Sequence, residues 1–165
     1  MQLLLHTEPF WFYFNFVIKL TKQADYAILL MSRFAGNSEV TQRSTSELSR
    51  DTGISLPMVN KTVKLLSKSG LLVSQRGVQG GYSLSKPTQR INLAEIIAAV
   101  EGPIELTECT QAGGVCELAG QCPTKPNWSL ISDAIRQSLE SITLFEMIHP
   151  MFLRARKRET ETHHE

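Results

Sequence analysis

The sequence has 165 residues, a length that suits one folded domain with an appendage and a core large enough to need no disulfides. Charged residues make up 20% of it, and its 10 glycines and 7 prolines are ordinary counts, which excludes a disordered or collagen-like chain. The net charge of +1 hides an asymmetry, because residues 19–90 carry eleven Lys and Arg against four Asp and Glu, whereas residues 91–165 carry six against eleven. A basic body is thus joined to an acidic one, and a basic body of this size indicates a phosphate-bearing partner such as nucleic acid.

Residues 1–18 form an aromatic leader that holds half of the twelve aromatic residues of the chain. Its apolar run, Phe10–Ile18, is too short to cross a membrane, which takes about 20 residues. No lysine or arginine precedes Lys19, so the basic start of a secretory signal is missing. We therefore expect a cytoplasmic protein with no membrane partner, and we expect its translation to start near Val17 or Ile18.

The next segment predicts three helices, from Thr21 to Gly36, from Ser44 to Gly53 and from Ser55 to Gly70. The second begins with a capping box, in which a Ser is followed three positions later by a Glu. The third has Pro57 in its first turn, where no backbone N–H is required. The second and third helices are separated by three residues around Gly53, which is typical of a helix-turn-helix.

Two short strands, Leu71–Arg76 and Tyr82–Ser85, flank the glycine-rich segment 77–81 and predict a β-hairpin. The fold expected is therefore mainly α with a small β-hairpin, a winged helix-turn-helix, in which the third helix enters the major groove and the hairpin reaches the DNA backbone. A lysine-rich helix face alone is more often a solvated surface, and a glycine cluster alone is only a turn; their succession in a basic body favours DNA. The residues expected to contact DNA are Ser55, Pro57, Met58, Asn60, Lys61, Lys64, Arg76, Gln79, Gly80 and Gly81.

The acidic half begins with a predicted helix over Leu93–Glu101, followed by a Gly-, Pro- and Cys-rich loop over residues 107–126. Asn127 is expected to cap a long amphipathic helix, and Thr143 to precede a short one. The apolar stripe of the long helix runs from Leu130 to Ile142 and favours packing on a second subunit. We divide the chain into the leader 1–18, the DNA-binding domain 19–90, the loop and dimerisation helices 91–150, and a charged tail 151–165.

All three cysteines, Cys109, Cys116 and Cys122, lie in that loop with the spacing C-x6-C-x5-C. An odd number of closely spaced cysteines argues against a disulfide framework and indicates a reducing compartment. Thiolates in a flexible loop can hold a soft metal centre, and the wide spacing suits a multi-atom iron–sulfur cluster better than zinc, which prefers C-x2–4-C pairs. Structural zinc is the second interpretation, and an inert or thiol-redox loop is the third, because cysteines are commonly small buried hydrophobes.

Other functional classes fit the sequence less well. The four histidines lie at positions 6, 149, 163 and 164, away from the cysteines, and no nucleophile–base pair is apparent, so we expect no enzyme. An electron carrier could use a cluster but would have no need of a basic winged helix.

Several short motifs together resemble one family of regulators. Lys19-Leu20-Thr21, Asp25-Tyr26-Ala27, Gly53-Ile54-Ser55, Gly70-Leu71, Arg76-Gly77 and Gly80-Gly81-Tyr82 are similar to the dimeric winged-helix iron–sulfur regulators of the IscR/NsrR type. Within that type, Glu101-Gly102-Pro103-Ile104, Leu106-Thr107-Glu108-Cys109, Cys122-Pro123 and Asn127-Trp128 resemble the branch that regulates the SUF cluster-assembly system. The resemblance covers about residues 18–150.

The resemblance implies a homodimer that binds palindromic, double-stranded promoter DNA and regulates iron–sulfur assembly genes, and we expect it to act as a repressor. It also implies one cluster per subunit, with 2Fe-2S favoured over 4Fe-4S, held by Cys109, Cys116 and Cys122. In the IscR branch a histidine three residues after the third cysteine completes the set, but Lys125 stands there in this chain. In the NsrR branch an aspartate of the first helix, from the other subunit, is the fourth ligand; Asp25 occupies that position. A carboxylate in the first turn of a helix is also favoured by the helix dipole alone.

Overall fold

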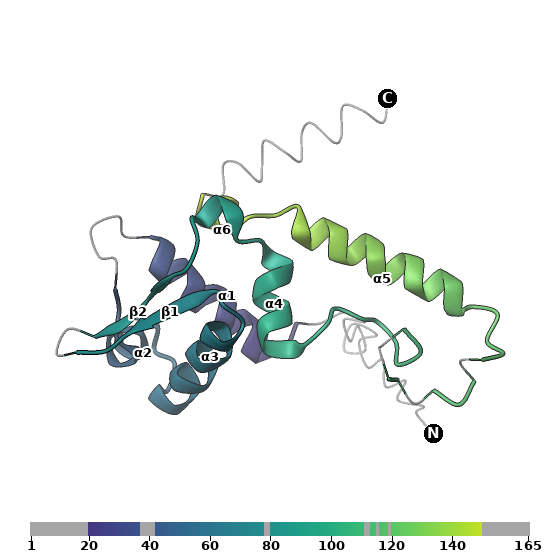
Figure 1. Ribbon diagram of the computed structural model, residues 1–165, viewed down its shortest axis with the longest axis horizontal. Coiled ribbons are helices and arrows are strands. Elements are labelled where there is room, and N and C mark those ends of the chain that lie inside the picture. Colours follow the sequence, from purple (N-terminus) through teal and green to yellow (C-terminus); the bar gives the residue numbers. More distant parts are fainter. Residues whose placement is uncertain are drawn as a thin grey trace, which may run out of the picture.

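The computed structural model describes residues 20–36, 42–77, 80–110, 113–114, 116–118 and 120–149. In these ranges the chain forms a helical body with a two-stranded antiparallel sheet, and Figure 1 shows α5 extending away from the end of the molecule that carries the sheet. The elements in chain order are α1 (Lys22–Ala35), α2 (Thr45–Thr52), α3 (Leu56–Lys68), β1 (Leu72–Gln75), β2 (Gly81–Leu84), the 3-10 turn η2 (Thr88–Arg90), α4 (Leu93–Glu101), α5 (Lys125–Glu140) and α6 (Leu144–Ile148). The predicted fold, mainly α with a small hairpin, is confirmed.

Local capping signals account for most helix boundaries. The hydroxyl of Thr21 accepts a hydrogen bond from the backbone N–H of Ala24 at the start of α1. At α2, the Ser44 side chain accepts from the N–H of Glu47, and the Glu47 carboxylate accepts from the N–H of Ser44, so the predicted capping box is confirmed. Gly53 ends α2 with a φ of 72°, a left-handed conformation that disfavours any residue with a Cβ.

The main hydrophobic core joins the two halves of the chain. It is built from apolar faces of α1, α2, α3, β1, α4 and α6, together with residues just outside these elements. Leu144 of α6 is completely buried, and its N–H donates to Ile91 O at 2.8 Å, while the N–H of Leu93 donates to Ile142 O at 2.9 Å. The segment after α5 therefore returns to the start of α4 and closes the core. The buried members are Ala27, Leu30, Met31, Phe34, Leu48, Ile54, Val59, Val63, Leu66, Leu71, Leu72, Ile91, Ile96 and Leu144.

The hairpin is slightly shorter than predicted and gains a third segment. Leu72 pairs with Leu84 and Gln75 with Gly81, so each strand has four residues. Arg43, just before α2, forms an isolated antiparallel bridge with Tyr82 on the free side of β2. This bridge attaches the hairpin to the start of α2, and the sequence carried no local signal for it.

The start of the long helix differs from the prediction. α5 begins at Lys125 with Thr124 at the N-cap, so Asn127 is the third helical residue and not the cap. Pro126 is tolerated inside the first turn because the backbone N–H groups there have no partner within the helix. Ile142 was expected on the apolar stripe of this helix but lies beyond its last residue, Glu140, and packs in a second, smaller core with Leu93 and Ile97.

Candidate nucleic-acid interface and cysteine loop

The outer face of α3 is polar and basic, as predicted. Val59, Val63 and Leu66 are fully buried, which turns the opposite side of the helix toward solvent. Exposed positions on that side are Ser55, Leu56, Pro57, Asn60, Lys61, Lys64 and Lys68. Lysines can neutralise phosphates and Asn60 can bind a base edge, so this face has the chemistry that major-groove entry requires.

Ser55 was expected to cap α3 and to contact DNA, and Met58 was expected to contact DNA. Ser55 occupies the N-cap position, but its hydroxyl makes no capping hydrogen bond; its carbonyl accepts from the N–H groups of Met58 and Val59, each at 3.0 Å. The Ser55 side chain is therefore not used to cap its own helix. Met58, by contrast, is half-buried and packs against the main core, which limits the surface that it can offer to a partner.

Lys61 is linked to α1. Its Nζ donates a 2.9 Å hydrogen bond to Gln23 Oε1, in the first turn of α1. Gln23 holds the ammonium group at the surface of α3 without neutralising it, because an amide oxygen carries no net charge. The position of this basic group thus depends on how α1 lies against α3.

The hairpin and the start of α2 enclose an open hollow of about 460 Å³. Ser44 and Thr45 line it from the helix, and Arg76, Gly77 and Tyr82 are among the residues that line it from the hairpin. Arg76 is exposed, which agrees with its predicted role at the base of the hairpin tip. Gln79 lies outside the described residues.

The two glycines of the tip have structural reasons to be glycine. The N–H of Gly80 donates to Gly77 O at 2.9 Å, so this N–H closes the turn and is not free for a phosphate. A Cβ on Gly80 would stand 2.6 Å from Gln75 O, and one on Gly81 would stand 2.8 Å from Arg43 O. At these two positions the structure shows a close approach of the chain to itself, and the expected contact of Gly80 and Gly81 with DNA stays a prediction.

The cysteine loop connects α4 to α5, and all three cysteines are within the described chain, half-buried and free of disulfides. Thr107 Oγ1 lies 3.2 Å from Cys109 Sγ, and Thr124 Oγ1 lies 3.1 Å from Cys122 Sγ. Hydrogen bonds from Thr124, first from its side chain and then from its backbone, lower the pKa of the Cys122 thiol below its ordinary value.

The described residues contain no group of three or more His, Cys, Asp or Glu side chains placed to hold a metal ion. The structure therefore does not bring the three thiols to one point. Their chemistry nevertheless fits an iron–sulfur cluster: three accessible cysteines, two of them facing hydroxyl groups that can hydrogen-bond to thiolate sulfur, form a soft donor set.

Asp25 is exposed in the first turn of α1. Its backbone N–H donates to Thr21 O at 3.1 Å, and the Thr21 hydroxyl donates to Glu101 Oε1 at the end of α4. Gly102 and Pro103 follow Glu101 and lead toward the cysteine loop. The start of α1 is therefore tied to the helix from which the loop departs.

One polar contact of the loop was not expected from the sequence. The N–H of Leu106 donates to Ser132 Oγ on α5 at 3.2 Å, and Ser132 is only 4% exposed. The sequence feature that points to this contact is the position of Ser132 close to the apolar residues Leu130, Ile131 and Ile135 of an amphipathic helix, which favours burial of its hydroxyl.

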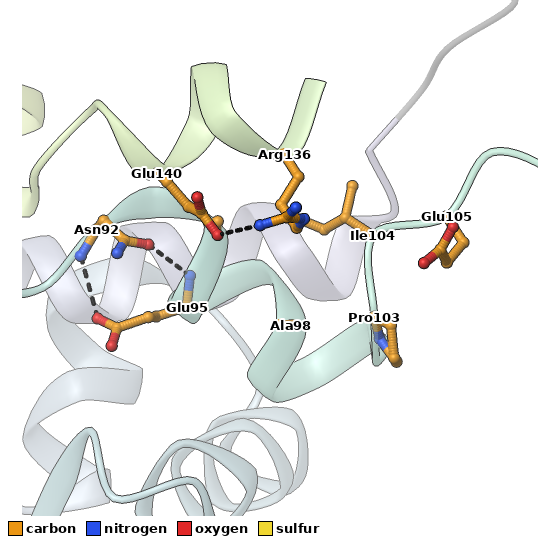
Figure 2. A pocket seen from close by; sticks show the side chains of 9 residues that line it. Asn92, Glu95, Ala98, Pro103, Ile104, Glu105, Arg136 and Glu140 are labelled. Atoms are coloured by element: carbon orange, nitrogen blue, oxygen red, sulfur yellow. Dashed lines mark hydrogen bonds and ion pairs between the residues drawn. The ribbon is translucent and has the colours of Figure 1, made fainter. Parts of the chain in front are cut away.

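The side of α5 that faces α4 leaves a hollow of about 210 Å³. Figure 2 shows Arg136 and Glu140 of α5 above Ala98 and Glu95 of α4, with Ile104 beside Arg136. Arg136 is fully engaged on its own helix, since it pairs with Glu140 at 2.8 Å and with Asp133 at 2.7 Å. The pairing raises the pKa of Arg136, chiefly through Asp133.

No helix in the part of the chain that the structure describes combines the length and apolarity needed to cross a membrane.

Comparison with known proteins agrees with this architecture. Residues 20–150 match the Rrf2 family, described as an iron-dependent transcriptional regulator. The chain is 35% identical over 132 residues to the HTH-type transcriptional regulator IscR of Escherichia coli and, equally, of Cronobacter sakazakii, covering 80% of this chain and 81% of either relative.

Solved structures are similar as well. T. potens IscR matches with a TM-score of 0.63 and 26% identity over 81% of this chain and 88% of that one. CymR, the global cysteine regulator of B. subtilis, matches with a TM-score of 0.61 and 25% identity over 80% and 97%.

Proposed function

The chain belongs to the Rrf2 family of winged-helix transcriptional regulators, and from this premise we propose that it controls iron–sulfur assembly genes through a cluster bound by its own cysteines. It is a DNA-binding regulator and not an enzyme, since its relatives are named as transcriptional regulators. The target proposed is a palindromic promoter of a SUF-type assembly operon, which the protein represses in the cytoplasm. The observation that carries the proposal is the half-buried, disulfide-free set of three thiols between α4 and α5.

Cys109, Cys116 and Cys122 would hold the cluster, with 2Fe-2S favoured, and the partner subunit's Asp25 would complete the set. When bound, the cluster supplies a centre whose presence depends on iron supply and oxidants. Thr107 and Thr124 stand beside Cys109 and Cys122 and can hydrogen-bond to their sulfur atoms. Asp25 is exposed at the surface of its own subunit, which supports a ligand role toward a partner.

A homodimer is proposed from the exposed apolar face of α5. Trp128 is 39% exposed, Ile131 44% and Leu130 69%, although each is a large apolar side chain on a long helix. Exposed apolar residues that cluster on one element indicate a protein partner, and a second copy fits because a palindrome needs two identical readers. The two α3 helices would then be separated by a distance that α5 packing sets.

For DNA, the basic face of α3 would enter the major groove and Arg76 would contact the backbone beside it. Asn60 supplies the amide for a base edge, whereas Lys61 and Lys64 supply charge. Because the N–H of Gly80 is used within the hairpin, we assign the glycines of the tip to shaping it and the phosphate contacts to Arg76 and the lysines.

Anaerobic purification tests the proposal directly. We expect a coloured protein with iron and acid-labile sulfide in stoichiometric amounts, and a change in affinity for its own assembly-operon promoter when the cluster is removed. Each of the three Cys→Ala variants should lose the colour and bind the promoter as the cluster-free protein does. If the protein contains zinc in place of iron, or if none of the three substitutions changes promoter binding, the cluster proposal is wrong. The loop is then a structural zinc site or a thiol-redox loop.

A further inference from the structure

The cysteine loop is attached to α5 at both ends. Cys122 lies two residues before Thr124, the N-cap of the helix. At the other end, Leu106 lies three residues before Cys109 and donates its N–H to Ser132 Oγ. Ser132 is about 12 Å along the helix from Thr124, at 1.5 Å per residue. Cys109 and Cys122 are therefore each connected to α5, at two different positions along the helix.

Ser132 is unusual for a helical serine. It is the buried residue of α5, all of which the structure describes. A serine within a helix commonly bonds back to a carbonyl one turn earlier, and Ser138 does so, donating to Ala134 O at 2.8 Å. Ser132 Oγ instead accepts a hydrogen bond from a residue 26 positions away. Burial of a hydroxyl without a hydrogen bond lowers the stability of the fold. The buried Ser132 hydroxyl has its hydrogen bond only while Leu106 lies against α5.

The neighbouring surfaces of α5 point to what the contact does. Arg136, one turn after Ser132, borders the hollow between α5 and α4 (Figure 2). Ile131, the residue before Ser132, belongs to the exposed apolar face proposed for the dimer. Ser132 thus connects a loop that carries thiols to a helix that borders a hollow against α4 and that presents the proposed dimer face.

We propose that Ser132 is a positioning residue that couples the cysteine loop to the dimer helix, by holding Leu106, and through it Cys109, in register on α5. The inference rests on the proposed function, because it concerns how that site is regulated. With the hydroxyl present, a rearrangement of the loop displaces α5 and changes the spacing of the two α3 helices. Without it, the loop acts on α5 only through the chain connection at Thr124, and a rearrangement around Cys109 is no longer transmitted to the middle of the helix.

Three variants of the full-length protein test the proposal: Ser132→Ala removes the hydroxyl, Ser132→Thr keeps it, and Ser138→Ala removes an exposed serine hydroxyl from the same helix. In cluster-free protein, amide hydrogen exchange at Leu106 should become about five- to tenfold faster in Ser132→Ala, the change expected for the loss of one hydrogen bond. The ratio of promoter affinities between cluster-loaded and cluster-free protein should fall toward one. Ser132→Thr and Ser138→Ala should match the wild type in both measurements.

Unchanged exchange at Leu106 in Ser132→Ala would overturn the proposal. Faster exchange with an unchanged affinity ratio would also overturn it, because the residue would then be structural only. If the wild-type protein contains no iron or sulfide, the proposed function fails. In that case two measurements on the wild type and Ser132→Ala still test the role of Ser132. One is the exchange rate at Leu106, and the other is the change in promoter affinity when the loop thiols are alkylated.

Discussion

Arg43 and Tyr82 exchange two backbone hydrogen bonds of 2.9 Å, one in each direction. Arg43 also pairs through Nη1 with Asp51 Oδ2 at 2.7 Å, near the end of α2. One residue thereby attaches the hairpin to both ends of the first helix of the helix-turn-helix. The orientation of the hairpin relative to α3 depends on this attachment, and so does simultaneous contact with the groove and the backbone of DNA.

Gly81→Ala should disrupt that attachment. The added Cβ would stand 2.8 Å from Arg43 O and 2.9 Å from Arg43 C, and backbone atoms cannot swing aside as a flexible side chain can. We expect a loss of about 1–3 kcal/mol in the free energy of unfolding, measured by urea denaturation, together with weaker promoter binding. Gly120→Ala is the control, since a Cβ there meets nothing within 4 Å. Equal stability of the two variants would contradict the close approach.

Lys64→Ala should weaken promoter binding uniformly across sequences. Lys64 lies on the exposed face of α3, and loss of one phosphate contact should lower the slope of log affinity against log salt by about one. Filter binding or fluorescence anisotropy at several salt concentrations measures this slope. Lys86→Ala serves as the matched control, because Lys86 pairs with Glu95 at 3.0 Å. A slope that stays the same in Lys64→Ala would place this face away from the DNA.

The capping box of α2 should make stability depend on pH. The backbone N–H of Ser44 and then its side chain lower the pKa of Glu47, because they hydrogen-bond to the ionised carboxylate. Since the folded-state pKa is depressed, the stabilisation is complete above the ordinary value of about 4.5 and is lost as the pH falls through the folded value. Glu47→Gln should flatten this part of the stability curve, measured by thermal denaturation between pH 3 and 7.

Ser44→Ala should lower the free energy of unfolding at pH 7 by about 1 kcal/mol, the usual cost of losing an N-cap side chain. Ser46→Ala, in the same turn and exposed, should cost less, because the capping hydrogen bonds run between Ser44 and Glu47. Chemical denaturation of the two variants side by side measures the difference. Similar losses would show that the cap contributes little here.

Asp25→Ala should shorten the lifetime of the visible absorption in air if the partner subunit's Asp25 is the fourth ligand. Loss of one ligand leaves an open coordination position that water and oxygen can reach. The exposed Arg33, in the last turn of α1, offers a control variant, Arg33→Ala, that should not change the lifetime. An unchanged spectrum and lifetime in Asp25→Ala would remove Asp25 from the ligand set.

Ile131→Glu should dissociate the proposed dimer. A carboxylate in an apolar interface is costly unless it is paired, and Ile131 lies 44% exposed on the dimer face of one subunit. Sedimentation equilibrium should show monomers, whereas Gln89→Glu, at an exposed position of the 3-10 turn η2 and outside α5, should keep the wild-type mass. A dimeric Ile131→Glu protein would indicate another interface.

Much of the fold could be predicted because its signals are local. Thr21, the Ser44–Glu47 box and Gly53 define helix ends through atoms three or four residues apart, and each is where the sequence predicted it. The basic face of α3 follows in the same way from helical periodicity. The start of α5 was misjudged by three residues, since Pro126 is compatible with the first turn as well as with the loop before it.

The candidate site could be predicted in its residue types but not in its connections. The sequence by itself determined which side chains carry charge, which carry thiols and in which segment each lies, because these depend on residue identity and short spacing. Only the three-dimensional structure showed that the N–H of Gly80 donates to Gly77 O and that the backbone of Arg43 leaves no space for a Cβ on Gly81. It also showed that the N–H of Leu106 donates to Ser132 Oγ. These contacts include partners as much as 38 residues apart, between Gly81 and Arg43, and such pairs leave no periodic trace in the chain. Each of these contacts lies within one half of the chain, whereas the main core contains residues of both halves, so the opposite charges of the two segments mark composition and not separate bodies.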